Sequence, residues 1–248
     1  MKKFLTVLLL FIVSTSIALG DGLKKIEILG GWEKSDGSIV YGLKISLNEG
    51  WKTYWHTPGP FGFKPQFDFE GSLNISDLNV LWPSPKIFGS SSFETIGYEN
   101  EVILPIAIKA EVDSDPINLK IKGSIGICYD VCMPIEFEAQ SGLKIISKEI
   151  NTDLLAALAN LPLSPSDLGK KNARCSITFS PTGFKIGADI PYLEKASSSI
   201  FFSIMDYRSE LSIEQPKLYN PGKTLYAIGE WRDKINLKIN GDLITITQ

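Results

Sequence analysis

Alternation of apolar and polar residues with a period of two runs through most of this chain and determines its fold class. Apolar residues alternate with smaller or polar ones between positions 39 and 47, and the pattern recurs at 117–121 and 184–190. Because successive side chains of a strand point to opposite faces, this spacing indicates strands with one buried face. Proline- and glycine-rich turns interrupt the pattern, for example at 57–60 and 82–85. Short strands joined by such turns are typical of β-sandwiches.

One segment departs from this pattern. Asn151 and the next two polar residues precede a run of leucine and alanine at 154–159, which predicts a short helix with an N-cap. A chain of 248 residues is long enough for two modest domains. We therefore expect two β-sandwich domains, at 21–150 and 174–248, joined by a helix and linker at 151–173. The second domain is expected to close in a hairpin around the Asn-Gly turn at 240–241.

The first twenty residues have the composition of a secretory signal peptide. Lys2 and Lys3 precede an apolar run at 4–13, and small residues at positions 18 and 20 fit a cleavage site. We expect residues 1–20 to be removed and the mature chain to lie outside the cytoplasm. No later apolar stretch reaches the roughly 18 residues that suggest a membrane span. Such a compartment permits disulfides.

Charge and histidine content argue against several function classes. The chain has 25 Lys and Arg against 28 Asp and Glu, so it has no basic field for nucleic acid. Its single histidine, His56, makes a His-rich zinc site impossible and argues against a Ser-His-Asp triad. We expect His56 to be a loop-edge residue, and we expect no resident metal or cofactor.

Cys128 and Cys132 form the one constellation that carries chemistry. Four residues of extended strand span about 13 Å, whereas a disulfide requires Cα atoms within about 7 Å. A turn at 129–131 must therefore join a strand ending at Cys128 to a second strand that Pro134 helps to start, at a sheet edge or loop rim. A bridge across so short a loop stabilises little, which favours a redox pair over a structural bridge. Free thiols or a metal site remain alternatives, since Met133 adds a sulfur that suits Cu(I).

The sequence around the pair predicts a passive disulfide. No Lys, Arg or His lies close to it in the chain, whereas Asp130 and Glu136, if near, would raise a thiol pKa. We therefore expect a more reactive partner to attack the disulfide. Cys175 is expected to be a small buried hydrophobe, with an intermolecular bridge or a regulatory thiol as the alternatives.

Two further groups of residues, one aromatic and one acidic, are expected to have structural roles. The aromatic residues between positions 51 and 82 are expected to pack the core, with a partner-docking surface as the alternative. The acidic residues Glu94, Glu99 and Glu101 are expected to form a solvated loop face.

Seven ordered motifs carry a resemblance to a known family. They are the segments at 50–55, 58–59, 65–69, 81–85, 96–102, 104–105 and 128–134. This order resembles the N-terminal periplasmic domain of the thiol:disulfide interchange protein DsbD. The three-residue gap between the cysteines is similar to its ScsB-like (suppressor of copper sensitivity) relatives, because archetypal DsbD spaces its cysteines more widely.

The resemblance implies a periplasmic immunoglobulin-like domain that works as a component of a protein-disulfide reductase. It implies electrons from a thioredoxin-like domain or membrane-embedded reductase, which we expect to be a separate polypeptide, and oxidised periplasmic proteins as acceptors. The family is associated with cytochrome c biogenesis and copper tolerance. The competing expectations are a non-catalytic binding module with a structural disulfide, and a Cu(I)-handling protein.

The same resemblance implies roles for individual residues. Cys132 would form the mixed disulfide with partners, and Cys128 would be the resolving thiol. A cap loop at 90–95 would cover the pair, with Phe93 as its lid. Glu94, Tyr98 and Tyr129 would surround the pair.

Overall fold

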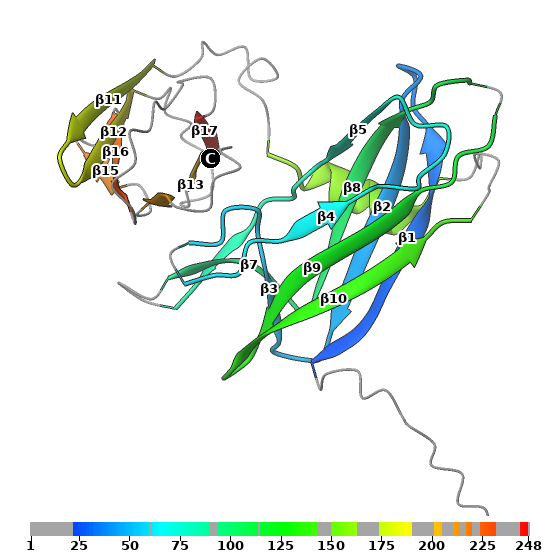
Figure 1. Cartoon of the computed structure of the whole chain (residues 1–248), viewed down its shortest axis with the longest axis horizontal. Helices are drawn as coiled ribbons and strands as arrows, with labels where there is room; N and C mark the ends of the chain where they lie inside the picture. The colour runs from blue at the N-terminus through cyan, green and yellow to red at the C-terminus, as the bar shows by residue number, and fades with distance from the viewer. Residues whose placement is uncertain are drawn as a thin grey trace, which may run out of the picture.

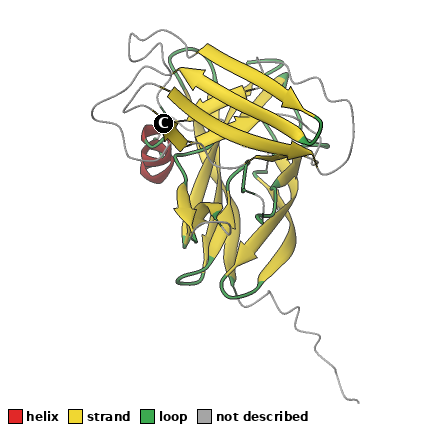
Figure 2. Ribbon diagram, turned by 90° about the vertical axis from the view of Figure 1, so that its left-hand side faces the viewer, coloured by secondary structure: helices red, strands yellow, loops and turns green. Residues whose placement is uncertain are grey.

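The computed structural model describes residues 22–59, 61–89, 94–113, 115–142, 150–162, 174–189, 201–204, 211–213, 217–219, 224–231 and 244–247. Antiparallel strands make up most of these residues, and one short helix accompanies them (Figure 1, Figure 2). The all-β, immunoglobulin-like architecture expected from the sequence is confirmed. Within the described ranges, no helix combines the length and the apolar character needed to cross a bilayer.

The first part of the chain folds into two antiparallel sheets. The four-stranded sheet has the order β1 (Leu23–Glu33), β2 (Ile39–Leu47), β8 (Glu101–Lys109) and β5 (Asp77–Val80). The other has the order β10 (Cys132–Gln140), β9 (Lys120–Cys128), β3 (Lys52–Tyr54), β7 (Thr95–Glu99) and β6 (Lys86–Phe88), and β4 (Gln66–Asp68) also pairs with β9. β10 is therefore the end strand of the sheet that carries both cysteines.

Alternate residues of these strands form one apolar core between the two sheets. β2 and β8 contribute fully buried side chains to it at every second position, and β9 contributes Ile121, Ile125 and Ile127. The strand predicted over 39–47 is thus confirmed in its bounds as β2. Since one face of β9 is committed to this core, its even-numbered residues lie on the outer face of the sheet.

Helix α1 (Thr152–Ala159) covers the outer face of the four-stranded sheet. Asn151 caps it, because its side-chain oxygen accepts a hydrogen bond of 3.0 Å from the Leu154 backbone N–H. Leu154 is completely buried in a small cluster with Val40 and Ile103. The helix expected in the connecting segment is therefore packed on the first sandwich, against β8 (Figure 1).

The second part of the chain is also built of antiparallel strands. Its main sheet has the order β11 (Arg174–Ser180), β12 (Gly183–Asp189), β16 (Thr224–Trp231) and β14 (Leu211–Ile213), and β15 (Lys217–Tyr219) also pairs with β16. β13 (Phe201–Ile204) pairs with β17 (Ile244–Thr247). The alternation predicted for β12 is confirmed, because Phe184, Ile186 and Ala188 are buried. The predicted hairpin turn at 240–241 lies outside the described residues.

The turn between β9 and β10 starts where the sequence predicts it, directly after Cys128, but it ends before Pro134. β9 ends at Cys128, whereas β10 begins at Cys132, two residues before Pro134. Cys128 and Cys132 face each other with a Cα separation of 4.1 Å, which is typical of an antiparallel pair without backbone hydrogen bonds. Pro134 opposes Gly126 two residues further on, at the same type of position, so its missing N–H removes no ladder bond.

Candidate functional site

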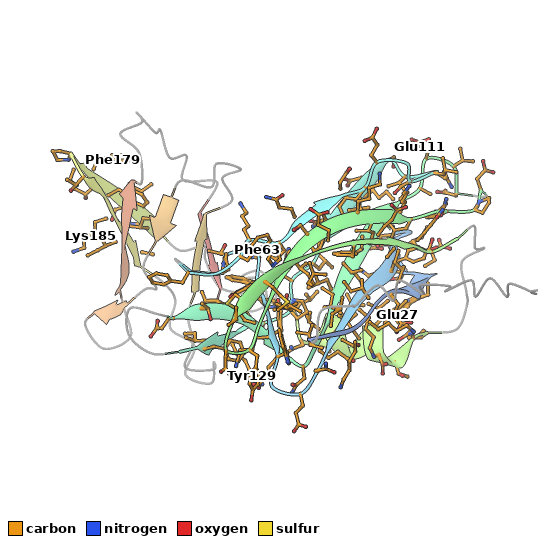
Figure 3. The ribbon with its side chains drawn as sticks, turned by 60° about the horizontal axis from the view of Figure 1, so that its bottom comes forward. Glu27, Phe63, Glu111, Tyr129, Phe179 and Lys185 are labelled. Carbon is orange, nitrogen blue, oxygen red and sulfur yellow. A yellow bond between two sulfur atoms is a disulfide. The ribbon has the colours of Figure 1, made fainter. Side chains whose placement is uncertain are left out.

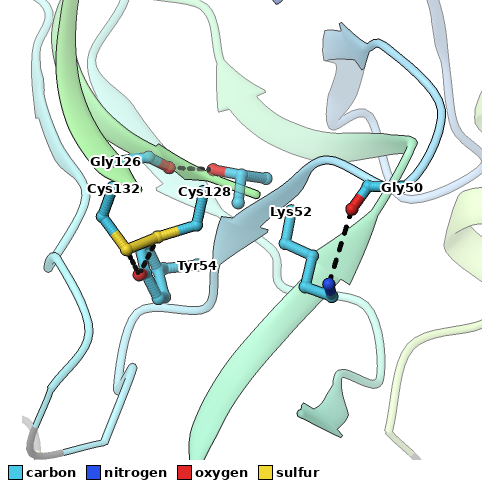
Figure 4. The surroundings of a disulfide bond; sticks show 7 residues. Gly50, Lys52, Tyr54, Gly126, Cys128 and Cys132 are labelled. Carbon is cyan, nitrogen blue, oxygen red and sulfur yellow. Dashed lines mark hydrogen bonds between the residues drawn. A yellow bond between two sulfur atoms is a disulfide. The ribbon is translucent and has the colours of Figure 1, made fainter. Parts of the chain in front are cut away.

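A disulfide joins Cys128 to Cys132 across the first pair of the β9–β10 hairpin (Figure 4). The strand register places the two residues directly opposite each other, so their side chains leave the sheet on the same face. Tyr129, Asp130 and Val131 form the turn, in which the Tyr129 N–H donates to the Val131 carbonyl over 3.4 Å. The turn predicted from the reach of the chain is thus present.

The two sulfur-bearing residues differ in their access to solvent. Cys128 is 8% exposed, whereas Cys132, on the end strand, is exposed. Thiol–disulfide exchange needs an incoming thiolate to reach one sulfur of the bond. Of the two, Cys132 is therefore the residue that another protein could reach.

The hydroxyl group of Tyr54 faces both sulfurs. Its oxygen lies 2.7 Å from Cys128 Sγ and 3.1 Å from Cys132 Sγ (Figure 4). A disulfide has no S–H group, so the tyrosine hydroxyl is the donor. Burial raises the pKa of Tyr54 above its usual value, so the hydroxyl keeps its proton at neutral pH. The site therefore contains a fixed hydrogen-bond donor for a sulfur that becomes negatively charged.

Gly126 makes room for this tyrosine. A Cβ at position 126 would lie 2.8 Å from Tyr54 Cε2 and would also overlap Phe63. The absence of a side chain on β9 lets the Tyr54 ring lie across the sheet towards the sulfurs. In Figure 3, Phe63 and Tyr129 lie at the end of the sandwich that carries the disulfide.

A row of four polar side chains crosses the outer face of the sheet at the level of the disulfide. Pairwise register links, from β7 to β10, Glu99, Lys52, Cys128 and Cys132. Lys52 Nζ lies 3.4 Å from the Gly50 carbonyl oxygen, 4.0 Å from Glu99 Oε1 and 5.4 Å from the centre of the Phe88 ring. A cation is therefore present one strand away from Cys128, although none is close in the sequence.

Two side chains of the turn between the cysteines are exposed to solvent. Tyr129 is 58% exposed and Val131 is 69% exposed. The Tyr129 ring stacks on Trp51, with 6.0 Å between ring centroids. Gly50 adopts a φ of +77° beneath it, where a Cβ would lie 2.8 Å from Tyr129 Cε2. The turn thus presents apolar surface beside the bond that a partner would attack.

The site residues expected from the sequence have different positions in the structure. Tyr129 lies next to the disulfide, and Glu94 is half-buried just before β7. Tyr98 points to the opposite face of the sheet, into the core, where its hydroxyl donates to the Pro83 carbonyl over 2.8 Å and burial raises its pKa. Phe93 lies outside the described residues. The structure therefore brings Cys128, Cys132 and Tyr129 together but separates Tyr98 from them.

Two residues of the site were not identified from the sequence. The sequence pattern assigns Tyr54 to the aromatic core residues and indicates no role for Lys52, since both are more than seventy positions from the cysteines. Their spacing contains a usable signal, because residues 52 and 54 of a strand share the face opposite the buried Thr53.

The remaining candidates lie away from this chemistry. Met133 opposes Ile127 and packs against the core, on the face opposite to both cysteines, so it adds no third sulfur there. His56 packs against Trp55 at 3.9 Å and Trp82 at 5.3 Å between ring centroids. Burial, with a smaller effect of the charge on Lys64, lowers its pKa to about 4. Cys175 opposes Ala188 in the β11–β12 pair, and its side chain lies outside the described residues.

Two of the three acidic residues expected on a solvated face, Glu99 and Glu101, are engaged in ion pairs. Glu101 Oε2 lies 3.1 Å from Lys44 Nζ and accepts a hydrogen bond from the Ser46 hydroxyl. Glu99 faces Lys52 in the row that contains the cysteines. Within the described residues, no group of three or more His, Cys, Asp or Glu side chains is arranged to hold a metal ion.

Comparison with known proteins shows what the first sandwich is similar to. Residues 31–142, which include both cysteines, match the family model described as the N-terminal part of the thiol:disulfide interchange protein DsbD. This stretch of the chain is therefore similar to the DsbD N-terminal domain family, as the resemblance of its motifs indicated.

A solved structure shares the fold over a longer stretch. It is the crystal structure of the N-terminal periplasmic domain of ScsB from Proteus mirabilis, with a TM-score of 0.59 and 23% sequence identity. The similarity covers 88% of this chain and 85% of that one. A search of curated proteins found no match.

Proposed function

We propose that this chain is a periplasmic thiol–disulfide exchange protein that carries electrons through the Cys128–Cys132 pair. The observation that carries the proposal is the asymmetry of the bridge, in which the exposed Cys132 is bonded to the buried Cys128 at the end of a sheet. The family match supports thiol–disulfide interchange as the class of chemistry.

The exchange runs in two steps. A thiolate of the donor attacks Cys132 Sγ, a donor–Cys132 disulfide forms, and the Cys128–Cys132 bond breaks with its electron pair on Cys128 Sγ. The second thiol of the donor then attacks the mixed disulfide, which releases Cys132 as a thiolate and leaves the donor oxidised. The protein gains two electrons, its two thiolates take up protons from water, and the reverse sequence reduces an acceptor.

Tyr54 gives the first step a stabilised leaving group. Its hydroxyl already lies 2.7 Å from Cys128 Sγ, so it donates to the thiolate without rearrangement. A hydrogen bond to a charged acceptor is stronger than one to a neutral acceptor. The Tyr54 hydroxyl therefore stabilises the Cys128 thiolate, the product of bond cleavage, more than it stabilises the intact disulfide.

The finer assignments follow the resemblance. We place the mature protein in the periplasm after removal of residues 1–20. We assign a thioredoxin-like domain or a membrane-embedded reductase as donor and oxidised periplasmic proteins as acceptors, in cytochrome c biogenesis or copper tolerance. We also assign Phe93 and Glu94 to a loop that controls access to Cys132.

Trapping of a mixed disulfide tests the proposal. In a Cys175→Ser background, Cys128→Ser leaves Cys132 free, and the Cys132 thiolate should displace thionitrobenzoate from a thioredoxin-like donor whose single cysteine carries that group as a mixed disulfide, so that a donor–Cys132 disulfide accumulates. Cys132→Ser, which leaves only the buried Cys128, should accumulate far less. Intact-mass measurement after alkylation would distinguish the two.

If the bridge were purely structural, the donor would not reduce it. The oxidised wild-type protein would then resist reduction by the donor and have a potential below about −300 mV. Equal trapping by the two cysteine variants would contradict the assignment of Cys132 as the attacked residue.

A further inference from the structure

We propose that Lys52 stabilises the Cys128 thiolate released during exchange, and that Glu99 limits this effect by holding the same ammonium group. The inference deepens the proposed function and rests on it for the identity of the leaving group. It concerns a cation that the sequence places far from the cysteines and the sheet places beside them.

Strand register carries the first step. Lys52 of β3 is directly opposite Cys128 of β9, which is directly opposite Cys132 of β10. In antiparallel strands, opposed side chains share a face and their Cβ atoms lie about 4.5–5.5 Å apart. Lys52 and Tyr54 extend from one face of β3, the face on which the sulfurs lie (Figure 4). A flexible four-carbon side chain can therefore bring its ammonium group to Cys128 Sγ.

The position of the leaving sulfur explains why a cation has an effect. Cys128 is 8% exposed, so a thiolate there loses much of its hydration, which disfavours the charged form. Tyr54 supplies one hydrogen bond. The exposed carboxylate of Asp130, in the turn next to Cys128, carries the opposite charge to Lys52 and disfavours the thiolate. Glu136 on β10 is also exposed but lies four residues from Cys132, about 13 Å along the strand, so its effect is screened. A positive charge on the neighbouring strand offsets these unfavourable contributions.

In the oxidised state, Lys52 is held by other groups. A neutral disulfide offers no charge with which Lys52 can pair. Its ammonium group instead donates to the Gly50 carbonyl oxygen, and the Nζ atom lies 4.0 Å from Glu99 Oε1 and 5.4 Å from the centre of the Phe88 ring. The Lys52 side chain is 30% exposed, which leaves it room to change rotamer. When Cys128 becomes a thiolate, it competes with Glu99 for the same cation. Lys52 transfers no proton in this step and changes only the stability of the charge.

The two residues therefore have opposite effects on Cys128. Without the charge of Lys52, the thiolate should become less stable, and without the charge of Glu99 it should become more stable. For partly screened charges about 5 Å apart, we expect loss of the Lys52 charge to lower the thiolate fraction about three- to tenfold at a pH below the midpoint of the Cys128 titration. Glu99 lies two strands from Cys128, about 10 Å away, so loss of its charge should raise the thiolate fraction by less.

The test measures the thiolate of Cys128 directly, in the full chain. A Cys132→Ser, Cys175→Ser background leaves Cys128 as the single thiol, and its ultraviolet absorbance is followed against pH. Lys52→Met should lower the thiolate fraction, Lys52→Arg should restore it, and Glu99→Gln should raise it. Lys120→Met is the matched control, because Lys120 lies on β9 eight residues from Cys128 and pairs with Glu138 at 3.1 Å. Lys120→Met removes an equal charge from β9, the strand that carries Cys128, and should leave the titration of Cys128 unchanged.

Specific outcomes would overturn the inference. These are equal titrations for Lys52→Met and Lys120→Met, failure of Lys52→Arg to restore the wild-type curve, or a lower thiolate fraction in Glu99→Gln. Thermal unfolding of each variant identifies any general loss of structure, and Lys52→Arg keeps the charge if Lys52→Met does not fold. Reduction of the wild-type disulfide by a thioredoxin-like donor is measured separately. A Lys52-dependent thiolate with no exchange would refute the proposed function alone, and exchange with an unchanged titration would refute this inference alone.

Discussion

The hydroxyl oxygen of Tyr54 lies 2.7 Å from Sγ of Cys128, the buried member of the hairpin disulfide. It also lies 3.1 Å from Sγ of Cys132, so one donor faces both ends of the bond. Either sulfur can become a thiolate during a two-step exchange, and each would find the same hydrogen-bond donor already in position. In the proposed exchange, the buried tyrosine would therefore stabilise the charge that cleavage of the bond creates.

Removal of this hydroxyl should slow exchange. A hydrogen bond to a charged group contributes about 1.5–3 kcal/mol, so Tyr54→Phe should reduce the rate of disulfide reduction about tenfold or more. The ring and its packing over Gly126 are retained. Stopped-flow measurement with a reduced thioredoxin-like protein gives the rate, and a rate within twofold of wild type would contradict the role of the hydroxyl.

Tyr98→Phe provides the control for a general effect of losing a buried hydroxyl. Tyr98 is also buried and bonded, but to the Pro83 carbonyl on the opposite face of the same sheet. We expect it to reduce stability by about 1 kcal/mol and to leave the exchange rate unchanged. Parallel losses of rate and stability in both variants would point to loosening of the fold instead of stabilisation of a thiolate.

A methyl group at position 126 should have a larger effect than the loss of the hydroxyl. Its carbon would overlap both Phe63 and the Tyr54 ring, so Gly126→Ala must displace at least one of them. We expect slower exchange together with a loss of stability of about 1–3 kcal/mol. Adding Tyr54→Phe to Gly126→Ala should change the rate little further, since the hydroxyl is then already misplaced; a full additive effect in the double variant would refute this coupling.

Local sequence signals predicted much of the fold that carries the site. The alternation over 39–47 predicted the bounds of β2, and Asn151 with the residues after it predicted a capped helix. The turn after Cys128 was predicted because four residues of extended strand are too long for a disulfide. Each of these depends on residues that are close in the chain. The packing of α1 on β8 depends on which sheet face is left uncovered, and no local pattern determines that.

The surroundings of the disulfide could not be predicted in the same way. Tyr54 and Lys52 reach Cys128 through pairing of β3 with β9, and strand order is set by the tertiary fold. Tyr98 is the converse case, because the resemblance suggested a place near the cysteines. Its spacing from the buried Ile96 assigns it to the core face, and the structure agrees with the spacing.

The exposed turn should matter for protein partners and not for small reductants. Tyr129 and Val131 are more than half exposed in the turn that precedes Cys132, and exposed apolar side chains can supply contact surface to a docking protein. Val131→Ser should lower the apparent second-order rate with a thioredoxin-like protein about three- to tenfold and leave the rate with dithiothreitol unchanged. Equal losses with both reductants would indicate a changed disulfide instead of a lost contact.

Two adjacent leucines of α1 test whether the helix stabilises the sandwich. Leu154 is completely buried on the four-stranded sheet, whereas Leu155 is 47% exposed. Leu154→Ala should lower the free energy of unfolding by about 2–5 kcal/mol, and Leu155→Ala should change it by less than about 0.5 kcal/mol. Urea unfolding followed by tryptophan fluorescence measures both. Since α1 packs on the sheet without the cysteines, exchange by folded Leu154→Ala should equal that of wild type, and a slower rate would reveal coupling between the two sheets.

His56 should make the fold sensitive to mild acid. Burial between Trp55 and Trp82, with a smaller effect of Lys64, lowers its pKa from 6.5 to about 4 in the folded protein. Between these values the unfolded chain binds a proton that the folded chain does not, so stability is complete above pH 6.5 and declines as the pH falls towards 4, by up to about 3 kcal/mol. The free energy of unfolding of wild type minus that of His56→Gln isolates this contribution, because the carboxylates titrate in both proteins. The difference should be constant above pH 7 and should fall steadily between pH 6.5 and 4; a difference that does not change with pH would mean that His56 titrates normally in the folded state.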